Sequence, residues 1–179
     1  MTHVLLTGGA RSGKSALAVA LAERDGADVV FLATGQPRDD EMAARIARHR
    51  VERPAHWTTV EEPVRLVEAI GAADPSACLI VDCLSLWVAN LLGAESPAGI
   101  ERAACSAATV AAARPSRTIV VTNEVGFGIV PATPLGRDYR DLLGRVNAIW
   151  AERATEAYLV VAGRVLPLLP ATEVLADGS

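Results

Sequence analysis

Short, largely apolar runs recur along this chain and alternate with stretches whose apolar residues repeat every three to four positions. Apolar runs of this length are typical of strands buried on both faces, whereas the longer spacing is typical of helices with one buried face. The runs that predict strands are Val4–Leu6, Val29–Ala33, Cys78–Val81 and Thr118–Val121. Because strands and helices alternate with short connections, the pattern predicts an α/β fold built on a mostly parallel sheet.

Six segments carry the helical pattern or its boundary signals. Acidic residues at 39–41 begin one segment, and Pro63 stands in the first turn of another, where both residue types suit a helix N-terminus. The longest segment is amphipathic and keeps its apolar residues on one face. The predicted helices are Ser15–Arg24, Asp39–Arg50, Glu62–Ile70, Leu84–Leu92, Pro97–Ala113 and Leu135–Trp150.

The remaining apolar segments complete the predicted sheet. Trp57–Val60 predicts a short strand, and Ala157–Ala162 and Val165–Leu169 predict two strands joined by a tight turn. Strands this close in sequence pair antiparallel, so we expect the sheet to end in a C-terminal antiparallel hairpin. A chain of 179 residues that is 51% hydrophobic can bury one sizeable core. We therefore expect a single domain that spans residues 1–179.

A glycine-rich loop joins the first predicted strand to the first predicted helix. It has the form G-x-x-x-x-G-K-S and consists of Gly8, Gly9, Ala10, Arg11, Ser12, Gly13, Lys14 and Ser15. Its two fixed glycines let the backbone turn closely enough to direct successive N–H groups at phosphate oxygens. Lys14 would contact the β- and γ-phosphates, and the Ser15 hydroxyl would hold Mg²⁺. The loop predicts nucleotide binding, and a glycine turn without a ligand is the alternative.

Polar residues follow two of the predicted strands. Asp82 ends the run Cys78–Val81, where a nucleotide-binding α/β fold places the acid that helps to hold Mg²⁺. An aspartate at a strand end can also cap the helix that follows it. Asn123 and Glu124 close the next strand on the same side of the sheet, and the same two interpretations apply to them.

His49 is the third candidate for chemistry. It shares one stripe of the helix 39–50 with Met42 and Ile46, and a histidine on an apolar stripe is usually packed in a core. Arginines surround it, at Arg45, Arg48, Arg50 and Arg53. Guanidinium groups bind phosphate, and a neutral imidazole can attack phosphorus. An arginine run is also typical of a solvated helix face, so composition alone leaves the role of His49 open.

Composition excludes several classes of protein. A net charge of −4 argues against a general nucleic-acid or anionic-membrane surface. The three cysteines have no C-x-x-C spacing, which argues against a disulfide framework and a zinc site. We find neither a signal peptide nor a long apolar run, so we expect a cytoplasmic protein without a membrane span. Lys14 is the only lysine, so the guanine-reading N-K-x-D motif of a GTP-dependent switch cannot occur.

Blocks of sequence along the chain match one known family. The most specific are the arginine- and histidine-containing helix followed by RPAHW at 53–57, and TNEVGFGIVP at 122–131. Others are GGARSGKS at 8–15, VDCLSLWVANLL at 81–92 and GRVN at 144–147. Together they span nearly the whole chain, which closely resembles the bifunctional adenosylcobinamide kinase and adenosylcobinamide-phosphate guanylyltransferase family of cobalamin biosynthesis.

The resemblance implies two reactions in one site. A nucleoside triphosphate phosphorylates the aminopropanol hydroxyl of adenosylcobinamide, and GTP then donates GMP to that phosphate with loss of pyrophosphate. GTP, and ATP for the kinase step, are the expected nucleotides. The resemblance also implies a P-loop, RecA-like fold and a homotrimer.

The same resemblance assigns roles to individual residues. It implies that GMP is carried on His49 and that Lys14 is catalytic. It implies that residues 8–15, Glu61 and Asp82 bind the nucleotide, and that Ser15 and Asp82 hold Mg²⁺.

Two other functions are compatible with parts of the pattern. A plain small-molecule kinase needs only the glycine-rich loop and Asp82, so His49 decides between it and the bifunctional enzyme. A RecA-like NTPase acting on nucleic acid is disfavoured by the acidic charge and by the single compact domain.

Overall fold

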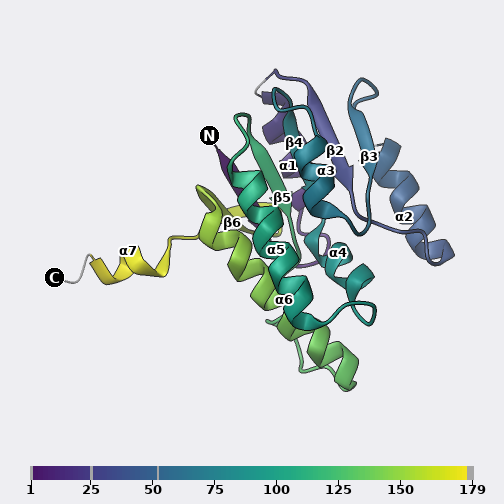
Figure 1. Cartoon of the computed structure of the whole chain (residues 1–179), viewed down its shortest axis with the longest axis vertical. Helices are drawn as coiled ribbons and strands as arrows, with labels where there is room; N and C mark the ends of the chain where they lie inside the picture. The colour runs from purple at the N-terminus through teal and green to yellow at the C-terminus, as the bar shows by residue number, and fades with distance from the viewer. Residues whose placement is uncertain (1, 25, 52, 177–179) are drawn as a thin grey trace.

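The computed structural model describes residues 2–24, 26–51 and 53–176, and in this part of the chain the strands form one seven-stranded sheet flanked by helices (Figure 1). The first half contains β1 (His3–Thr7), α1 (Lys14–Arg24), β2 (Val29–Ala33), α2 (Asp40–Val51), β3 (Thr58–Glu61), α3 (Leu66–Ala72) and β4 (Cys78–Asp82). The second half contains α4 (Leu84–Leu91), α5 (Pro97–Ala112), β5 (Thr118–Val121), α6 (Pro134–Arg153), β6 (Glu156–Val161), β7 (Arg164–Pro167) and α7 (Ala171–Ala176).

The strand order is β3-β2-β4-β5-β1-β6-β7, and every neighbouring pair is parallel except β6–β7. Ala162 and Gly163 join this last pair with φ values of 51° and 71°, the positive values that a two-residue hairpin turn requires. The predicted α/β fold, with its mostly parallel sheet and C-terminal antiparallel hairpin, is confirmed.

The order of the strands brings the polar strand ends together. β5 lies between β1 and β4, with Leu6 opposite Val121 and Asp82 opposite the same Val121. The glycine-rich loop after β1, Asp82 at the end of β4 and the segment after β5 therefore share the carboxyl edge of the sheet. Parallel α/β sheets bind their ligands at this edge.

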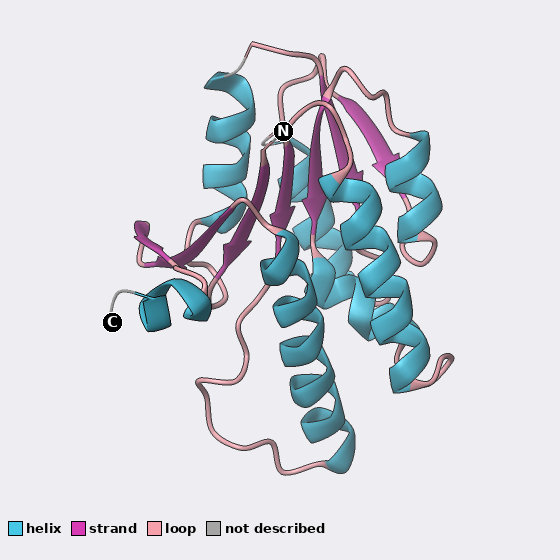
Figure 2. Ribbon diagram, turned by 60° about the vertical axis from the view of Figure 1, so that its left-hand side comes forward, coloured by secondary structure: helices cyan, strands magenta, loops and turns pink. Residues whose placement is uncertain are grey.

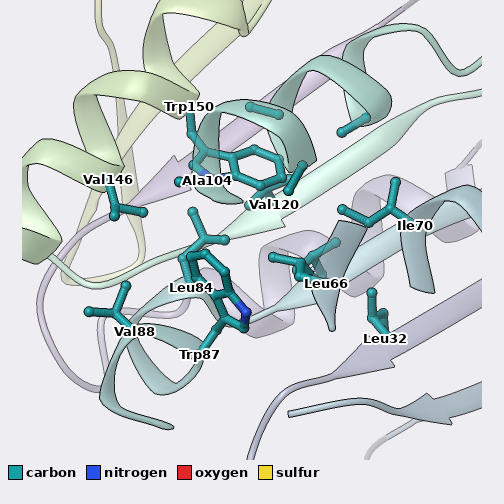
Figure 3. Packing of buried hydrophobic residues seen from close by; sticks show 14 of the residues in the cluster. Leu32, Leu66, Ile70, Leu84, Trp87, Val88, Ala104, Val120, Val146 and Trp150 are labelled. Atoms are coloured by element: carbon teal, nitrogen blue, oxygen red, sulfur yellow. The ribbon is translucent and has the colours of Figure 1, made fainter. Parts of the chain in front are cut away.

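Alternating strand residues face two apolar layers, and helices cover both faces of the sheet (Figure 2). On one face, Leu5, Leu32 and Val120 pack under α3, α4, α5 and α6. Figure 3 shows the centre of this layer, where Trp87 of α4 and Trp150 of α6 lie among buried aliphatic side chains. On the other face, α1 packs over strand residues that point the opposite way. These layers fix the sheet and leave its carboxyl edge accessible.

Helix α2 differs from the helices of these layers. None of its residues is buried, and Figure 1 places it at the right-hand side of the molecule next to β3. Its first turn is stabilised by the carboxylate of Asp39, which accepts a hydrogen bond from the Met42 amide at 2.7 Å. The helix therefore forms from good local signals but contributes little to the core.

Three features differ from the sequence predictions. The segment 62–65 is not helical, because the Glu62 carboxylate accepts hydrogen bonds from the amides of Val64 and Arg65 and forms a turn before α3. Leu135 is exposed although its spacing predicts a place on the apolar face of the helix, since α6 begins beyond the apolar layer that its later turns help to form. The short helix α7 was not predicted.

Candidate active site

The glycine-rich loop lies between β1 and α1 with backbone angles that need its glycines. Gly8 and Gly13 have φ values of 149° and 101°. A Cβ atom on Gly8 would lie 2.2 Å from the carbonyl oxygen of Val160 in β6, so no larger residue fits there. The amide of Gly163, in the β6–β7 turn, donates to the Ser12 carbonyl at 2.9 Å. The glycine-rich loop is thus fixed both by its connection to β1 and by its contacts with the C-terminal hairpin.

Lys14 is folded against this loop. Its Nζ atom donates to the carbonyl oxygens of Gly8 at 2.9 Å and Gly9 at 2.7 Å, and to Ser12 Oγ at 3.3 Å. Burial lowers the pKa of Lys14, and the negative charge of Asp82 opposes this effect. The only lysine of the chain is therefore at the centre of the glycine-rich loop, with partners that a phosphate could replace.

A hollow of about 260 Å³ opens beside the loop, and we call it the nucleotide hollow. Ser15 from α1, Asp82 from β4 and His49 from α2 all line it, although they are far apart in sequence. Glu61 of β3 lines it as well. The structure thus gathers four of the residues that the sequence singled out.

Arginines of α2 and of the segment after it also border the nucleotide hollow. Arg45, Arg50 and Arg53 line the nucleotide hollow, whereas Arg48 is exposed and does not. Arg50 forms an ion pair with Glu61. The guanidinium of Arg53 stacks on Phe31 of β2 at 3.6 Å from the ring centroid, and its burial lowers its pKa, an effect that Asp82 opposes. The hollow therefore combines several cations with two carboxylates.

The apolar stripe of α2 also faces this hollow. Met42 and Ile46 line it together with His49, and all three are half-buried. The stripe that could have indicated a core histidine instead places the imidazole against the hollow.

The backbone beside Asp82 is held by Thr34, which directly follows β2. The buried Thr34 hydroxyl donates to the Cys83 carbonyl at 2.7 Å and accepts from the Cys83 amide at 2.9 Å. The Asn90 side chain donates to the Thr34 carbonyl at 2.8 Å. Helix α4 has Cys83 as its N-cap residue, so Asp82 does not cap it. No sequence motif indicated Thr34, because its role depends on a contact between two strand ends.

Asn123 and Glu124 lie apart from the nucleotide hollow. The Asn123 side chain donates to Ser85 Oγ at 2.9 Å, and the Glu124 amide donates to the Gly8 carbonyl at 3.0 Å. Glu124 lines a different hollow, beside α6. These residues therefore border the glycine-rich loop from the side of β5.

The described residues contain neither a metal-binding cluster of three or more acidic, histidine or cysteine side chains nor a membrane-spanning helix. No described group of three or more His, Cys, Asp or Glu side chains could hold a metal ion. No helix among residues 2–24, 26–51 and 53–176 is long and apolar enough to cross a membrane.

Comparisons with solved structures concern the fold alone. The flagellar accessory protein FlaH from Methanocaldococcus jannaschii matches with a TM-score of 0.50 and 12% identity, over 92% of this chain and 74% of that one. The RadB recombinase matches with a TM-score of 0.50 and 15% identity, over 88% and 73%. These likenesses confirm the predicted P-loop, RecA-like fold.

Comparisons of sequence give the family. The protein CobP of Pseudomonas aeruginosa, a bifunctional adenosylcobalamin biosynthesis protein, is 44% identical over 92% of this chain and 95% of its own length. The bifunctional adenosylcobalamin biosynthesis protein CobU of Escherichia coli is 44% identical over 89% and 96%. The model of one family, described as cobinamide kinase / cobinamide phosphate guanyltransferase, matches residues 4–168. This chain therefore belongs to the cobinamide kinase / cobinamide phosphate guanyltransferase family.

Proposed function

We propose that this protein phosphorylates adenosylcobinamide with a nucleoside triphosphate and then transfers GMP from GTP to adenosylcobinamide phosphate. Membership of the family supports both activities. The single observation that carries the proposal is that Ser15, Asp82 and His49 line one hollow beside the glycine-rich loop. A kinase needs the first two residues, whereas a histidine nucleophile is needed only for GMP transfer.

In the kinase reaction the glycine-rich loop binds the phosphates. Its amides and Lys14 offset the negative charge that moves onto the phosphate oxygens, with Lys14 exchanging its present carbonyl partners for those oxygens. The Ser15 hydroxyl and the Asp82 carboxylate would hold Mg²⁺, since both line the same hollow and hard cations prefer oxygen ligands. When bound, Mg²⁺ neutralises part of the phosphate charge.

In the guanylyltransferase reaction His49 is the nucleophile. An imidazole nitrogen bonds to the α-phosphorus of GTP while the bond from that phosphorus to the pyrophosphate oxygen breaks. A phosphate oxygen of adenosylcobinamide phosphate then displaces the imidazole and takes the GMP. Arg45, Arg50 and Arg53 line the hollow beside His49, where they can bind the phosphates of GTP.

Labelled GTP tests the proposal directly. Incubated with Mg²⁺ and GTP but without corrinoid, the protein should retain label from the α-phosphate and none from the γ-phosphate. The bond should be labile to acid and stable to base, as a phosphoramidate is. His49→Ala should lose this label and GMP transfer while keeping much of the kinase reaction.

His56→Ala is the matched control, because His56 is an exposed histidine outside the nucleotide hollow. It should label as the wild type does. Label that persists in His49→Ala, or that never forms in the wild type, would show that the protein is a plain kinase or transfers GMP by another route.

We also propose that the protein is a cytoplasmic homotrimer. Exposed apolar side chains at the end of β6, along the edge strand β7 and in the segment after it support self-association: Val161, Val165, Leu166 and Leu169. Sedimentation at micromolar concentration tests this, and a monomer would contradict it.

A further inference from the structure

The block at 122–131 takes no part in the nucleotide hollow, although it runs beside the glycine-rich loop. It follows β5, which pairs with β1, and the Glu124 amide donates to the Gly8 carbonyl at 3.0 Å. Val125 packs against the large apolar layer. The beginning of this segment is therefore fixed both to the core and to the first residue of the loop.

The other end of the segment is fixed to α6. The Arg137 guanidinium donates to the carbonyl oxygens of Pro131 at 2.9 Å and Ala132 at 3.0 Å. The Thr133 hydroxyl caps the helix by accepting from the Gly136 amide at 3.2 Å. Figure 2 shows the segment as a long pink loop that leaves the sheet and reaches the far end of the long helix.

Between these anchors the loop exposes large apolar side chains. Phe127 is 83% exposed, Ile129 is 97% exposed and Val130 is 64% exposed. Gly126 lies where a Cβ atom would meet the Glu124 carboxylate at 2.8 Å, and its amide donates to that carboxylate. Apolar side chains on a loop that is held at both ends are suited to contact a ligand.

A second hollow lies between this loop and α6, and we call it the α6 hollow. Glu124 and Gly126 line it from the loop, and small residues at Gly144 and Ala148 leave space on the helix. Arg140, Asp141 and Arg145 also line it, and their charges are balanced by the ion pairs Arg140–Asp141 and Arg145–Glu101. The α6 hollow therefore offers both hydrogen-bond donors and acceptors beside small apolar surfaces.

The glycine-rich loop lines the nucleotide hollow and is hydrogen-bonded to a residue of the α6 hollow. Ser15 lines the nucleotide hollow, and Gly8 is bonded to Glu124, which lines the α6 hollow. Phosphoryl transfer needs the acceptor oxygen and the leaving oxygen on opposite sides of the phosphorus. If the nucleotide occupies the nucleotide hollow, the α6 hollow remains for the molecule that accepts the phosphoryl group.

We propose that the α6 hollow and the exposed side chains of Phe127, Ile129 and Val130 bind the corrin ring of cobinamide, an inference that rests on the proposed function. Corrin is a large, flat macrocycle with apolar methyl groups and a fringe of amide side arms. Its faces match the exposed apolar side chains, and its amides match the mixed donors and acceptors of the hollow. A corrin ring bound near Glu124 would bring the aminopropanol arm of cobinamide to the glycine-rich loop.

Filling the hollow is the first test. Ala148→Leu keeps a good helix former and places a larger side chain in the α6 hollow, and Ala151→Leu makes the same change at an exposed position outside it. Binding of adenosylcobinamide without nucleotide is measured by equilibrium dialysis and visible absorbance. We expect Kd to rise at least about tenfold in Ala148→Leu and to stay within about twofold of wild type in Ala151→Leu.

Removing the apolar side chains is the second test. The double variant Phe127→Ser/Ile129→Ser should weaken corrinoid binding at least about tenfold, because two large apolar contacts are lost. Val51→Ser is the control, since Val51 is 86% exposed at the end of α2 and lines neither the nucleotide hollow nor the α6 hollow. Sedimentation of each variant reports its assembly state.

The outcomes separate this inference from the proposed function. Wild-type corrinoid binding in Ala148→Leu and in the double variant overturns the acceptor site while the labelled His49 still supports GMP transfer. A double variant that binds corrinoid normally but changes its assembly state shows that the loop contacts a second copy of the chain. A wild-type protein that labels with GTP but binds no corrinoid overturns both the acceptor site and the proposed substrate.

Discussion

Arg114 and the arginines of α2 lie in two regions that use the same side chain differently. Arg114 is buried, and its guanidinium donates to the carbonyl oxygens of four residues around the end of α3: Ile70, Ala73, Asp74 and Ala77. Arg45 and Arg50 are exposed and line the nucleotide hollow. Neutral carbonyls surround the Arg114 guanidinium, which therefore joins chain segments. The guanidinium groups beside the hollow, of which that of Arg50 pairs with Glu61 at the surface, can exchange their partners for a phosphate.

The surroundings of Arg114 and of the α2 arginines also differ in how many apolar side chains they bury. The layer of α3, α4, α5 and α6 contains most of the buried apolar side chains, whereas α2 has none. Substitutions in the layer should therefore change the free energy of unfolding, and substitutions around the nucleotide hollow should change turnover. The four predictions that follow test this separation.

The largest effect is expected from Lys14→Ala. Both proposed reactions place charge on phosphate oxygens that the ammonium stabilises, so both rates should fall at least about 100-fold. Steady-state assays of the two reactions and a thermal unfolding curve check this. Full kinase activity in the variant would contradict a shared site for the two reactions.

Arg114→Ala should change stability instead. The variant leaves four carbonyl oxygens at a buried turn without their donor, so the free energy of unfolding should fall by about 2–4 kcal/mol. Urea denaturation measures it. Arg48→Ala, on exposed α2, is the control and should stay within about 0.5 kcal/mol of wild type. An equal decrease in the free energy of unfolding in both variants would contradict the proposed difference between the buried layer and α2.

Asp82→Asn should raise the Mg²⁺ concentration needed for half-maximal turnover by about tenfold, because an amide is a weaker ligand for a hard cation than a carboxylate. The free energy of unfolding should change little, since Asp82 lines the hollow and does not cap α4. A Mg²⁺ titration of both enzymes decides the point. An unchanged requirement would exclude Asp82 as a metal ligand.

His3 should make the scaffold sensitive to mild acid. It is buried edge-on to Trp150 at 5.5 Å between ring centroids, and burial lowers its pKa. Near pH 6.5 the unfolded chain therefore binds a proton at His3 that the folded chain does not bind. The free energy of unfolding is then highest above that pH and decreases as the pH falls, by at most about 1.4 kcal/mol per pH unit. Urea midpoints between pH 7 and 5.5 measure the slope. His3→Gln should flatten it, and an equal slope in that variant would assign the effect to other groups.

The sequence predicted most of the sheet because its strands are short apolar runs with clear limits. The predicted start of α3 was wrong because the Glu62 carboxylate accepts hydrogen bonds from the amides of Val64 and Arg65. These bonds compete with the first helical turn, and residue spacing does not reveal them. The stripe of Met42, Ile46 and His49 was visible as a pattern. Whether it faced a core or a hollow depended on where α2 lies relative to β2 and β4.

Other parts of the site required tertiary contacts. Arg53 stacks on Phe31, and Thr34 bonds to Cys83, although each pair is distant in sequence. The residues of the glycine-rich loop could be named in advance because their function depends on local spacing. Contacts between strand ends depend on strand order, which the sequence pattern left undetermined.

The single lysine makes this protein unusually simple to monitor by amine chemistry. An acylating reagent can modify only one side-chain amine, that of Lys14, a residue that is 6% exposed and hydrogen-bonded to the glycine-rich loop. A protease that cleaves after lysine likewise has one site in the whole chain. The extent of acylation at residue 14, read by peptide mass, therefore reports how often the Lys14 amine leaves its partners in the glycine-rich loop, without any engineered probe.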